Sequence, residues 1–257
     1  NSLLYLVDKH GSDTIYHHDF NPIEGVDQHP TGFGLKEIDH LTHNVYKGRM
    51  DMWYDFYHRI FNFHEIRYFD IKGERTGLFS RALTSPCGKI RIPINESQDN
   101  ISQIAEYLDE YKGEGIQHIA LTTDDINNSV NTLRLHGVPF TSVPQTYYDM
   151  LEDRLPGHGL DIETLSKNNI LIDGEIDGTK KDLLLQIFSK TVIGPIFFEF
   201  IQRLGHQVRR RGRARWPGAE SAVPRGARAP TAPYPHGDAR GGPQPGSRRH
   251  QPARIRG

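Results

Sequence analysis

The stretch "EIDHLTHNV" (residues 37–45) decides the fold, because a similar stretch, "GIQHIALTT" (residues 115–123), occurs later in the chain. In both stretches, β-branched and apolar residues alternate with polar ones, which predicts a strand. Each predicted strand carries a His near its beginning, His40 in the first and His118 in the second. A repeat of this kind indicates first that the fold is built from two similar units, and only then a function.

A helix is predicted after each of these two strands. The first lies in "RMDMWYDFYHRIFNF" (residues 49–63), whose apolar residues at helical spacing are Met52, Trp53, Phe56, Tyr57 and Ile60. The second lies in "DDINNSVNTLRLHGVPF" (residues 124–140), where Asp124 or Asp125 is the expected N-cap and Gly137 the expected end. The two strands therefore begin similar units.

Three further strands are predicted after each helix. They are "HEIRYFDI", "TGLFSRAL" and "GKIRIPI" in the first unit, and "ILIDGEID", "KDLLLQIFS" and "GPIFFEFIQR" in the second. A polar insertion, "YYDMLEDRLPGHGLDIETLSKN", precedes the strands of the second unit. The pattern predicts an α+β fold built from two β-α-β-β-β units, each roughly 80 residues long.

The two ends of the chain differ from these units. Residues 1–35 combine a strand-like start, "SLLYLVD", with a loop rich in His, Pro and Gly, and the first residue is Asn rather than Met, which suggests that a longer protein has been cut. Residues 206–257 contain twelve Arg, no Lys, two acids and only three residues of the Val, Ile, Leu, Phe and Met types. Such a composition predicts a disordered tail. It is also typical of GC-rich coding sequence read out of frame.

Charge and cysteine content indicate the class of protein. The formal net charge of −1 combines +10 in residues 206–257 with −11 in residues 1–205, so the acidic part is interpreted as a soluble, enzyme-like domain. The single cysteine, Cys87, excludes an intrachain disulfide and favours a reducing cytoplasm. No window has the roughly 20 apolar residues of a membrane span, and the start lacks the pattern of a signal peptide.

Three residues are candidates for chemistry. A lone strand His is more often packed or on the surface than a ligand, but His40 and His118 occupy equivalent positions in two units that would pack face to face. His43 faces the other side of its strand and is the weaker candidate. Glu199, in "IFFEFIQR", has apolar neighbours on both faces; it is either an edge-strand acid paired with Arg203 or a metal ligand. Two His and one carboxylate are typical of non-haem Fe(II) oxygenases.

Five motifs, "GLKEIDHLTHNV", "IPINE", "GEGIQHIALTTDDI", "LLLQIFSK" and "GPIFFEFIQR", occur in an order that is similar to one known family. From about residue 1 to Arg203 the chain resembles the catalytic half of the 4-hydroxyphenylpyruvate dioxygenase family, in the vicinal oxygen chelate superfamily. The resemblance implies an open barrel of two modules, residues 36–114 and 115–205, around Fe(II) bound by His40, His118 and Glu199. Residues 1–35 would be a remnant of the preceding domain and its connector.

The resemblance also implies a substrate pocket. Its polar residues would be Ser80, Asn95, Gln103, Gln117 and Gln186, and its aromatic wall would be Phe188 and Phe197. Amides and a hydroxyl can hydrogen-bond a keto acid and a phenol without adding a charge that competes with the iron. Without the family, each of the five is an ordinary polar residue near a strand, and the two Phe are core residues.

The implied reaction converts 4-hydroxyphenylpyruvate and O2 to homogentisate and CO2 in tyrosine and phenylalanine catabolism, in a homo-oligomer. After Arg203 the family continues with a Gly-rich loop and a C-terminal helix that closes the pocket, and no residue of "LGHQVRRRGRARWPG" maps onto that helix. Two alternatives stay open. The first is 4-hydroxymandelate synthase of the same family, with the same substrate and ligands. The second is an inactive fragment whose Arg cluster at residues 209–211 binds nucleic acid, although no stacking aromatic platform accompanies it.

Overall fold

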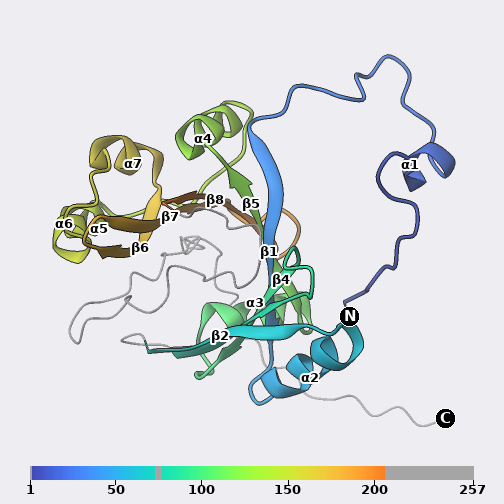
Figure 1. Ribbon diagram of the computed structural model, residues 1–257, viewed down its shortest axis with the longest axis horizontal. Coiled ribbons are helices and arrows are strands. Elements are labelled where there is room, and N and C mark those ends of the chain that lie inside the picture. Colours follow the sequence, from blue (N-terminus) through green and yellow to red (C-terminus); the bar gives the residue numbers. More distant parts are fainter. Residues whose placement is uncertain (1, 73–76, 206–257) are drawn as a thin grey trace, which may run out of the picture.

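The computed structural model describes residues 2–72 and 77–205, and within them eight strands form one sheet (Figure 1). The strand order is β2-β3-β4-β1-β5-β8-β7-β6. The strands are β1 (Leu35–Val45), β2 (His64–Lys72), β3 (Gly77–Thr84), β4 (Arg91–Ser97), β5 (Gly115–Thr123), β6 (Leu171–Asp177), β7 (Lys180–Phe188) and β8 (Phe197–Leu204). The helices are α1 (Ile15–His18), α2 (Met50–Phe61), α3 (Gln103–Tyr111), α4 (Ile126–Leu135), α5 (Gln145–Asp149), α6 (Leu151–Arg154) and α7 (Ile162–Asn168).

The sheet consists of two equivalent halves that meet where β1 pairs antiparallel with β5. β1 pairs parallel with β4, and β5 pairs parallel with β8 in the same way. His40 is opposite Ala120 and His118 is opposite Thr42, so a two-fold relation about the Leu41–Ile119 pair exchanges the two His positions. The predicted α+β fold of two β-α-β-β-β units is therefore confirmed.

Each half has its own hydrophobic core on the face of the sheet that points away from His40 and His118. In the first half α2 packs there, and His43 contacts its Trp53 and Tyr57 rings. In the second half α4 to α7 gather around β6, β7 and β8 (Figure 1), and the core includes Ile126, Leu151, Ile172 and Phe200. We call the opposite face, which carries His40 and His118, the inner face.

Most predicted boundaries agree with the structure. Asp125 is the N-cap of α4 and accepts a hydrogen bond from the Asn128 N–H, and Gly137 follows the helix with φ +86°. The apolar side predicted for α2 is wrong in part, because Met52 and Ile60 are exposed. Their place at the core is taken by Met50, which lies one turn before Trp53 and was not predicted.

The strand-like start is a wrong prediction. Residues 2–8 form no strand (Figure 1). The side chains of Leu3, Tyr5 and Leu6 are exposed. An apolar alternation becomes a strand only when a neighbouring strand supplies hydrogen-bond partners, and none lies beside it in the described chain. α3 was not predicted, although Ser102 caps it by accepting from the Ala105 N–H. The predicted tail, residues 206–257, lies outside the described residues.

Gly174→Ala is expected to destabilise the protein. Gly174 in β6 has φ +134°, and an added Cβ would lie 2.1 Å from the carbonyl oxygen of Asp182 on β7. We expect a loss of at least about 2 kcal/mol in the free energy of unfolding, measured by urea denaturation. Gly178→Ala is the matched control, because Gly178 also has positive φ (+58°) but has open space around it. Equal losses in the two variants would contradict the steric explanation.

Candidate metal centre

Three adjacent strands at the middle of the sheet bring His40, His118 and Glu199 together on the inner face. β5 lies between β1 and β8, and Ala120 on β5 is opposite both His40 on β1 and Glu199 on β8. The small side chain of Ala120 leaves room for His40 and Glu199 to reach each other above it. His118 enters from two residues earlier on β5 and completes the group.

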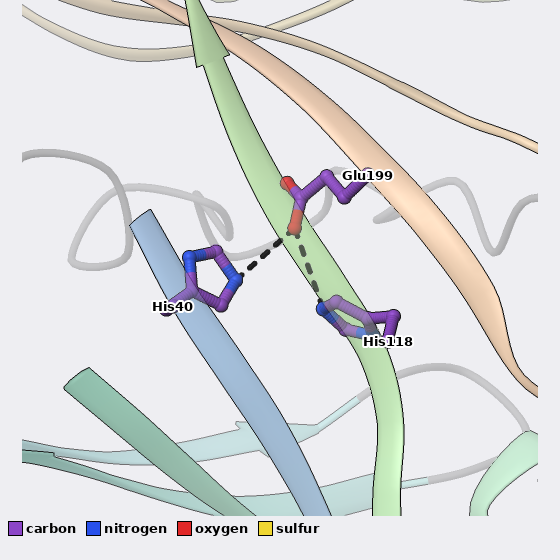
Figure 2. Close-up of side chains that lie close together, drawn as sticks. All are labelled: His40, His118 and Glu199. Carbon is purple, nitrogen blue, oxygen red and sulfur yellow. Dashed lines mark ion pairs between the residues drawn. The ribbon is translucent and has the colours of Figure 1, made fainter. Parts of the chain in front are cut away.

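One carboxylate oxygen of Glu199 contacts both rings (Figure 2). Glu199 Oε2 lies 3.1 Å from His40 Nε2 and 3.3 Å from His118 Nε2. One ligand atom from each residue lies within 4.8 Å of the others, so the group could hold a metal ion. Two imidazole nitrogens and one carboxylate oxygen form a donor set that suits divalent transition metals.

The alternative interpretation of Glu199 as an edge-strand acid is wrong. β8 lies between β5 and β7, and the Glu199 residue is only 4% exposed. On the outer face its neighbours Phe198 and Phe200 belong to the hydrophobic core. A carboxylate in this environment is stabilised only by partners that offset its desolvation, and the two His provide them.

The three groups shift one another's pKa. Burial raises the pKa of Glu199, but contacts with His40 and His118 lower it more, to about 2. Burial lowers the pKa of His40, but Glu199 and Asp39 raise it more, to about 9. The pKa of His118 is lowered because burial outweighs its contact with Glu199. In the absence of a metal, His40 therefore carries the proton that balances the Glu199 charge at neutral pH.

Metal affinity is expected to rise with pH up to about 9, because a bound metal must replace the His40 proton. Below the folded-state pKa of about 9, one displaced proton lowers the apparent affinity by a factor of about 10 for each pH unit. Zn(II) titrations with a competing indicator dye at pH values of about 6.5, 7.5 and 8.5 would measure this slope. The affinity of the dye alone at each pH is the control. A pH-independent affinity of the protein would show that His40 is already neutral.

A β-bulge precedes each of the two His. β1 has one extra residue, Asp39, between the pairs Ile38–Leu121 and His40–Ala120. β5 has one extra residue, Gln117, between the pairs Thr42–His118 and His43–Ile116. The extra residue lets its side chain lie on the same side as the following His. For Asp39 this agrees with the contact between its side chain and His40.

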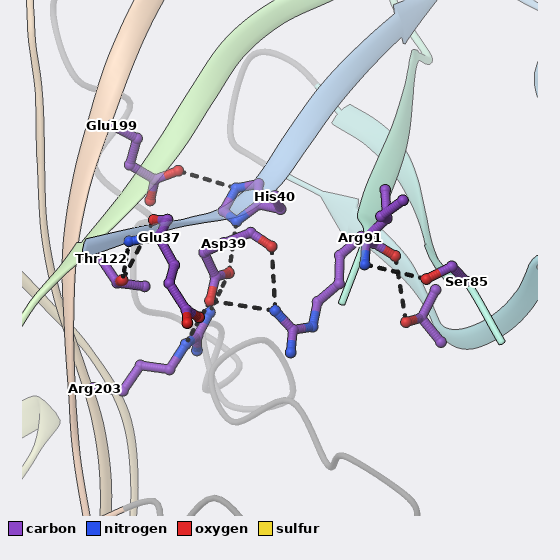
Figure 3. Close-up of polar contacts among 10 residues, drawn as sticks. Glu37, Asp39, His40, Ser85, Arg91, Thr122, Glu199 and Arg203 are labelled. Atoms are coloured by element: carbon purple, nitrogen blue, oxygen red, sulfur yellow. Dashed lines mark hydrogen bonds and ion pairs between the residues drawn. The ribbon is translucent and has the colours of Figure 1, made fainter. Parts of the chain in front are cut away.

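Asp39 is a functional candidate that was not predicted from the sequence. Its Oδ1 atom lies 2.9 Å from His40 Nδ1 and 3.0 Å from Arg203 Nη2, and Arg91 Nη1 lies 3.6 Å from its Oδ2 (Figure 3). Burial raises the pKa of Asp39, but hydrogen bonds from His40 and Arg203 lower it well below its ordinary value. One signal in the sequence could have indicated it: the first repeat has the acid Asp39 before its His, in "IDH", where the second repeat has the amide Gln117, in "IQH".

Two of the predicted pocket residues lie side by side on the inner face of the first half. Ser80 is opposite Asn95, and Asn95 is opposite Asn44, which was not predicted. The Asn44 amide and Asn95 Oδ1 are buried, and neither has a hydrogen-bond partner within the described chain. Tyr107 of α3 lies close to this row near Gly115, and its hydroxyl also lacks a partner there. Buried amides without partners cost free energy unless a ligand or water binds them.

The two predicted aromatic residues lie beside His118. The ring of Phe197 stacks on His118 at 4.9 Å, and Phe188 lies 6.2 Å from His118 and 5.9 Å from Phe197. Gln186 is opposite Ile201, two residues before Phe188 on the same face. Gln103 is the first residue of α3 and is exposed.

A cavity of about 440 Å³ lies at the ends of β1 and β4, next to α3. It is lined by Val45, Tyr46, Lys47, Ser97, Asp99, Asn100, Ala105, Leu108, Asp109 and Lys112. None of the predicted substrate residues lines it, so this cavity does not support their role.

No helix within residues 2–72 and 77–205 combines the length and apolar character needed to cross a bilayer.

The chain is similar to known proteins. A family model described as the Glyoxalase/Bleomycin resistance protein/Dioxygenase superfamily matches residues 37–152. A 4-hydroxyphenylpyruvate dioxygenase of Pseudomonas aeruginosa is 61% identical over 208 residues, which are 80% of this chain and 57% of that protein. The chain therefore spans little more than half of the length of this relative.

Two solved structures are also similar. A fusion protein of a xylose isomerase-like TIM barrel and 4-hydroxyphenylpyruvate dioxygenase is 33% identical with a TM-score of 0.62, covering 80% of this chain and 32% of that chain. A variant of 4-hydroxymandelate synthase from Streptomyces coelicolor is 29% identical with a TM-score of 0.60, covering 70% of this chain and 51% of that chain.

Proposed function

Since the chain belongs to the vicinal oxygen chelate superfamily and is a relative of 4-hydroxyphenylpyruvate dioxygenase, we propose that it carries the iron site of that enzyme. The reaction is the conversion of 4-hydroxyphenylpyruvate and O2 to homogentisate and CO2 in tyrosine and phenylalanine catabolism. The observation that supports it is the convergence of His40, His118 and Glu199 on one point of the inner face.

In this proposal His40, His118 and Glu199 bind Fe(II). Bound Fe(II) would supply a chelation point for the 2-oxo acid group of the substrate and the means to activate O2. Glu199 contributes one negative charge that offsets part of the metal charge, whereas both His bind as neutral ligands. Phe198 and Phe200 pack behind Glu199 and exclude water from that side of the strand.

The remaining residues hold the substrate. Phe188 and Phe197 form an aromatic wall next to His118, where the substrate ring can stack and be shielded from water. The polar residues that can hydrogen-bond the keto acid and the phenol are Ser80, Asn95, Gln103, Gln117 and Gln186, to which we add Asn44. The buried amide group of Asn44 and the buried Oδ1 of Asn95, which have no hydrogen-bond partner within the described residues, support this role.

The test is Fe(II)-dependent turnover of 4-hydroxyphenylpyruvate, with the product identified by chromatography and mass spectrometry. Homogentisate should form with Fe(II) and should not form after chelation or with Zn(II), which binds the same donors but has no redox chemistry. The similarity to 4-hydroxymandelate synthase makes 4-hydroxymandelate the alternative product. Formation of 4-hydroxymandelate instead would replace our assignment, and a failure to bind any divalent metal would refute both.

Three broader features belong to the same proposal. The catalytic domain would span residues 36–205, with modules at residues 36–114 and 115–205 and a connector at residues 1–35. The exposed free thiol of Cys87 fits a reducing cytoplasm. The active form would be a homo-oligomer, which light scattering of the purified protein would test.

A further inference from the structure

The two His of the centre differ in what supports their second ring nitrogen. His40 Nδ1 lies 2.9 Å from Asp39 Oδ1, whereas His118 Nδ1 is buried and has no hydrogen-bond partner within residues 2–72 and 77–205. The difference arises at equivalent positions, because Asp39 and Gln117 are the bulged residues before the two His. The two halves of the sheet therefore differ at the residue before each His, which is an acid before His40 and an amide before His118.

The donor and the acceptor of each hydrogen bond around Asp39 can be assigned. Arg203 donates to Asp39 at 3.0 Å and 3.4 Å, and Arg91 donates to the Asp39 backbone carbonyl at 3.2 Å (Figure 3). A guanidinium can only donate hydrogen bonds and an ionised carboxylate can only accept them. Asp39 must therefore accept from Nδ1–H of His40, which leaves Nε2 as the ring nitrogen that faces Glu199.

The network also joins the strands that carry the ligands. Arg203 lies four residues after Glu199 on β8, and Arg91 lies on β4. Both reach the same side chain on β1, and Asp39 is only 7% exposed. The position of the His40 ring relative to Glu199 is thus tied to β8 through a second, independent contact between β1 and β8.

We propose that Asp39, held by Arg203 and Arg91, is the positioning residue that fixes the ring orientation and tautomer of His40, while His118 binds without such support. This inference rests on the proposed function, because it assumes that His40 Nε2 is a metal ligand. Hydrogen bonds of this kind orient a ligating His, and their loss typically weakens metal binding about 10- to 100-fold.

Asp39→Asn is the sharpest variant, because it keeps the size of the side chain but removes its negative charge and one of its two acceptor atoms. Asp39 Oδ1 accepts from both His40 Nδ1 and Arg203 Nη2, and Oδ2 lies 3.4 Å from Arg203 Nε and 3.6 Å from Arg91 Nη1. All of these nitrogens are donors, so either orientation of the amide places its NH2 group against donors. The amide therefore holds the His40 ring less firmly than the carboxylate does.

The experiment measures Co(II) binding by its visible absorption and the His40 Nδ1–H hydrogen bond by the 1H chemical shift of that proton in the Zn(II)-loaded protein. We expect the Co(II) Kd of Asp39→Asn to rise at least about tenfold, with an upfield shift of the His40 Nδ1–H signal. Asp173→Asn is the matched control, because Asp173 is a partly buried acid on β6 outside the centre. It should bind Co(II) like the wild type.

The outcomes separate the two proposals. If Asp39→Asn lowers only the thermal stability and keeps the wild-type Co(II) Kd and His40 Nδ1–H chemical shift, Asp39 is structural and this inference is wrong. If the wild type itself binds no Co(II), the proposed iron site is wrong. Should Asp39→Asn fail to fold, Arg203→Gln decides, because it removes one donor to Asp39. An Arg203→Gln Kd within twofold of the wild type would overturn the inference, and a rise of several-fold would support it.

Discussion

Glu199→Gln is expected to lower Fe(II)-dependent turnover by about three orders of magnitude, which corresponds to about 4 kcal/mol of transition-state stabilisation. The carboxylate is the only one of the three converging groups that carries a negative charge. An amide of the same size offers a neutral oxygen and two N–H donors, so it neither offsets the metal charge nor binds Fe(II) as firmly. Turnover and Co(II) binding are measured on the same preparations.

Glu114→Gln is the control for this change. The Glu114 side chain is 9% exposed and accepts hydrogen bonds from Arg49 Nε and from Trp53 Nε1 of α2, rather than contacting the three converging groups. Its replacement is expected to reduce stability and to leave the Co(II) Kd unchanged. Wild-type Co(II) affinity in Glu199→Gln would show that Glu199 is not a ligand.

The repeat made most of the fold predictable. Strand alternation and helical spacing depend on neighbours within the segment, so β1, β5 and the helices after them could be located from local patterns. The equivalence of His40 and His118 then implied that they meet, and the structure brings them to ring centroids 5.6 Å apart. Glu199 could be added because a carboxylate with apolar residues on both strand faces requires a partner.

The Asp39 network could not be predicted in this way. Arg203 is separated from Asp39 by 164 positions in the sequence, and nothing in the local pattern of either residue indicates the other. The β-bulge that turns Asp39 to the side of His40 depends on the pairing of β1 with β5. A strict period of two would have placed the Asp39 side chain on the outer face. Asn44 was missed for a related reason, because its burial depends on how β1, β4 and α3 come together.

His118→Ala is expected to reduce turnover at least about a hundredfold while changing the stability of the metal-free protein by no more than about 1 kcal/mol. The variant loses the Phe197 stacking contact and one contact to Glu199. It also removes the buried Nδ1, which has no partner in the described chain and costs about 1 to 3 kcal/mol. These terms oppose each other, so the net change in the free energy of unfolding is small.

His40→Ala is the matched comparison, because it removes the equivalent ring with the same loss of volume. Here the variant leaves two buried carboxylates, Asp39 and Glu199, without the cation that lies between them. Breaking a buried ion pair in this way costs about 3 to 5 kcal/mol, reduced to the extent that Arg203 still binds Asp39. Urea denaturation of both chelator-treated variants therefore separates the roles of the two rings. Equal destabilisation by the two substitutions would contradict the asymmetry, since only His40 is bound on both ring nitrogens before any metal arrives.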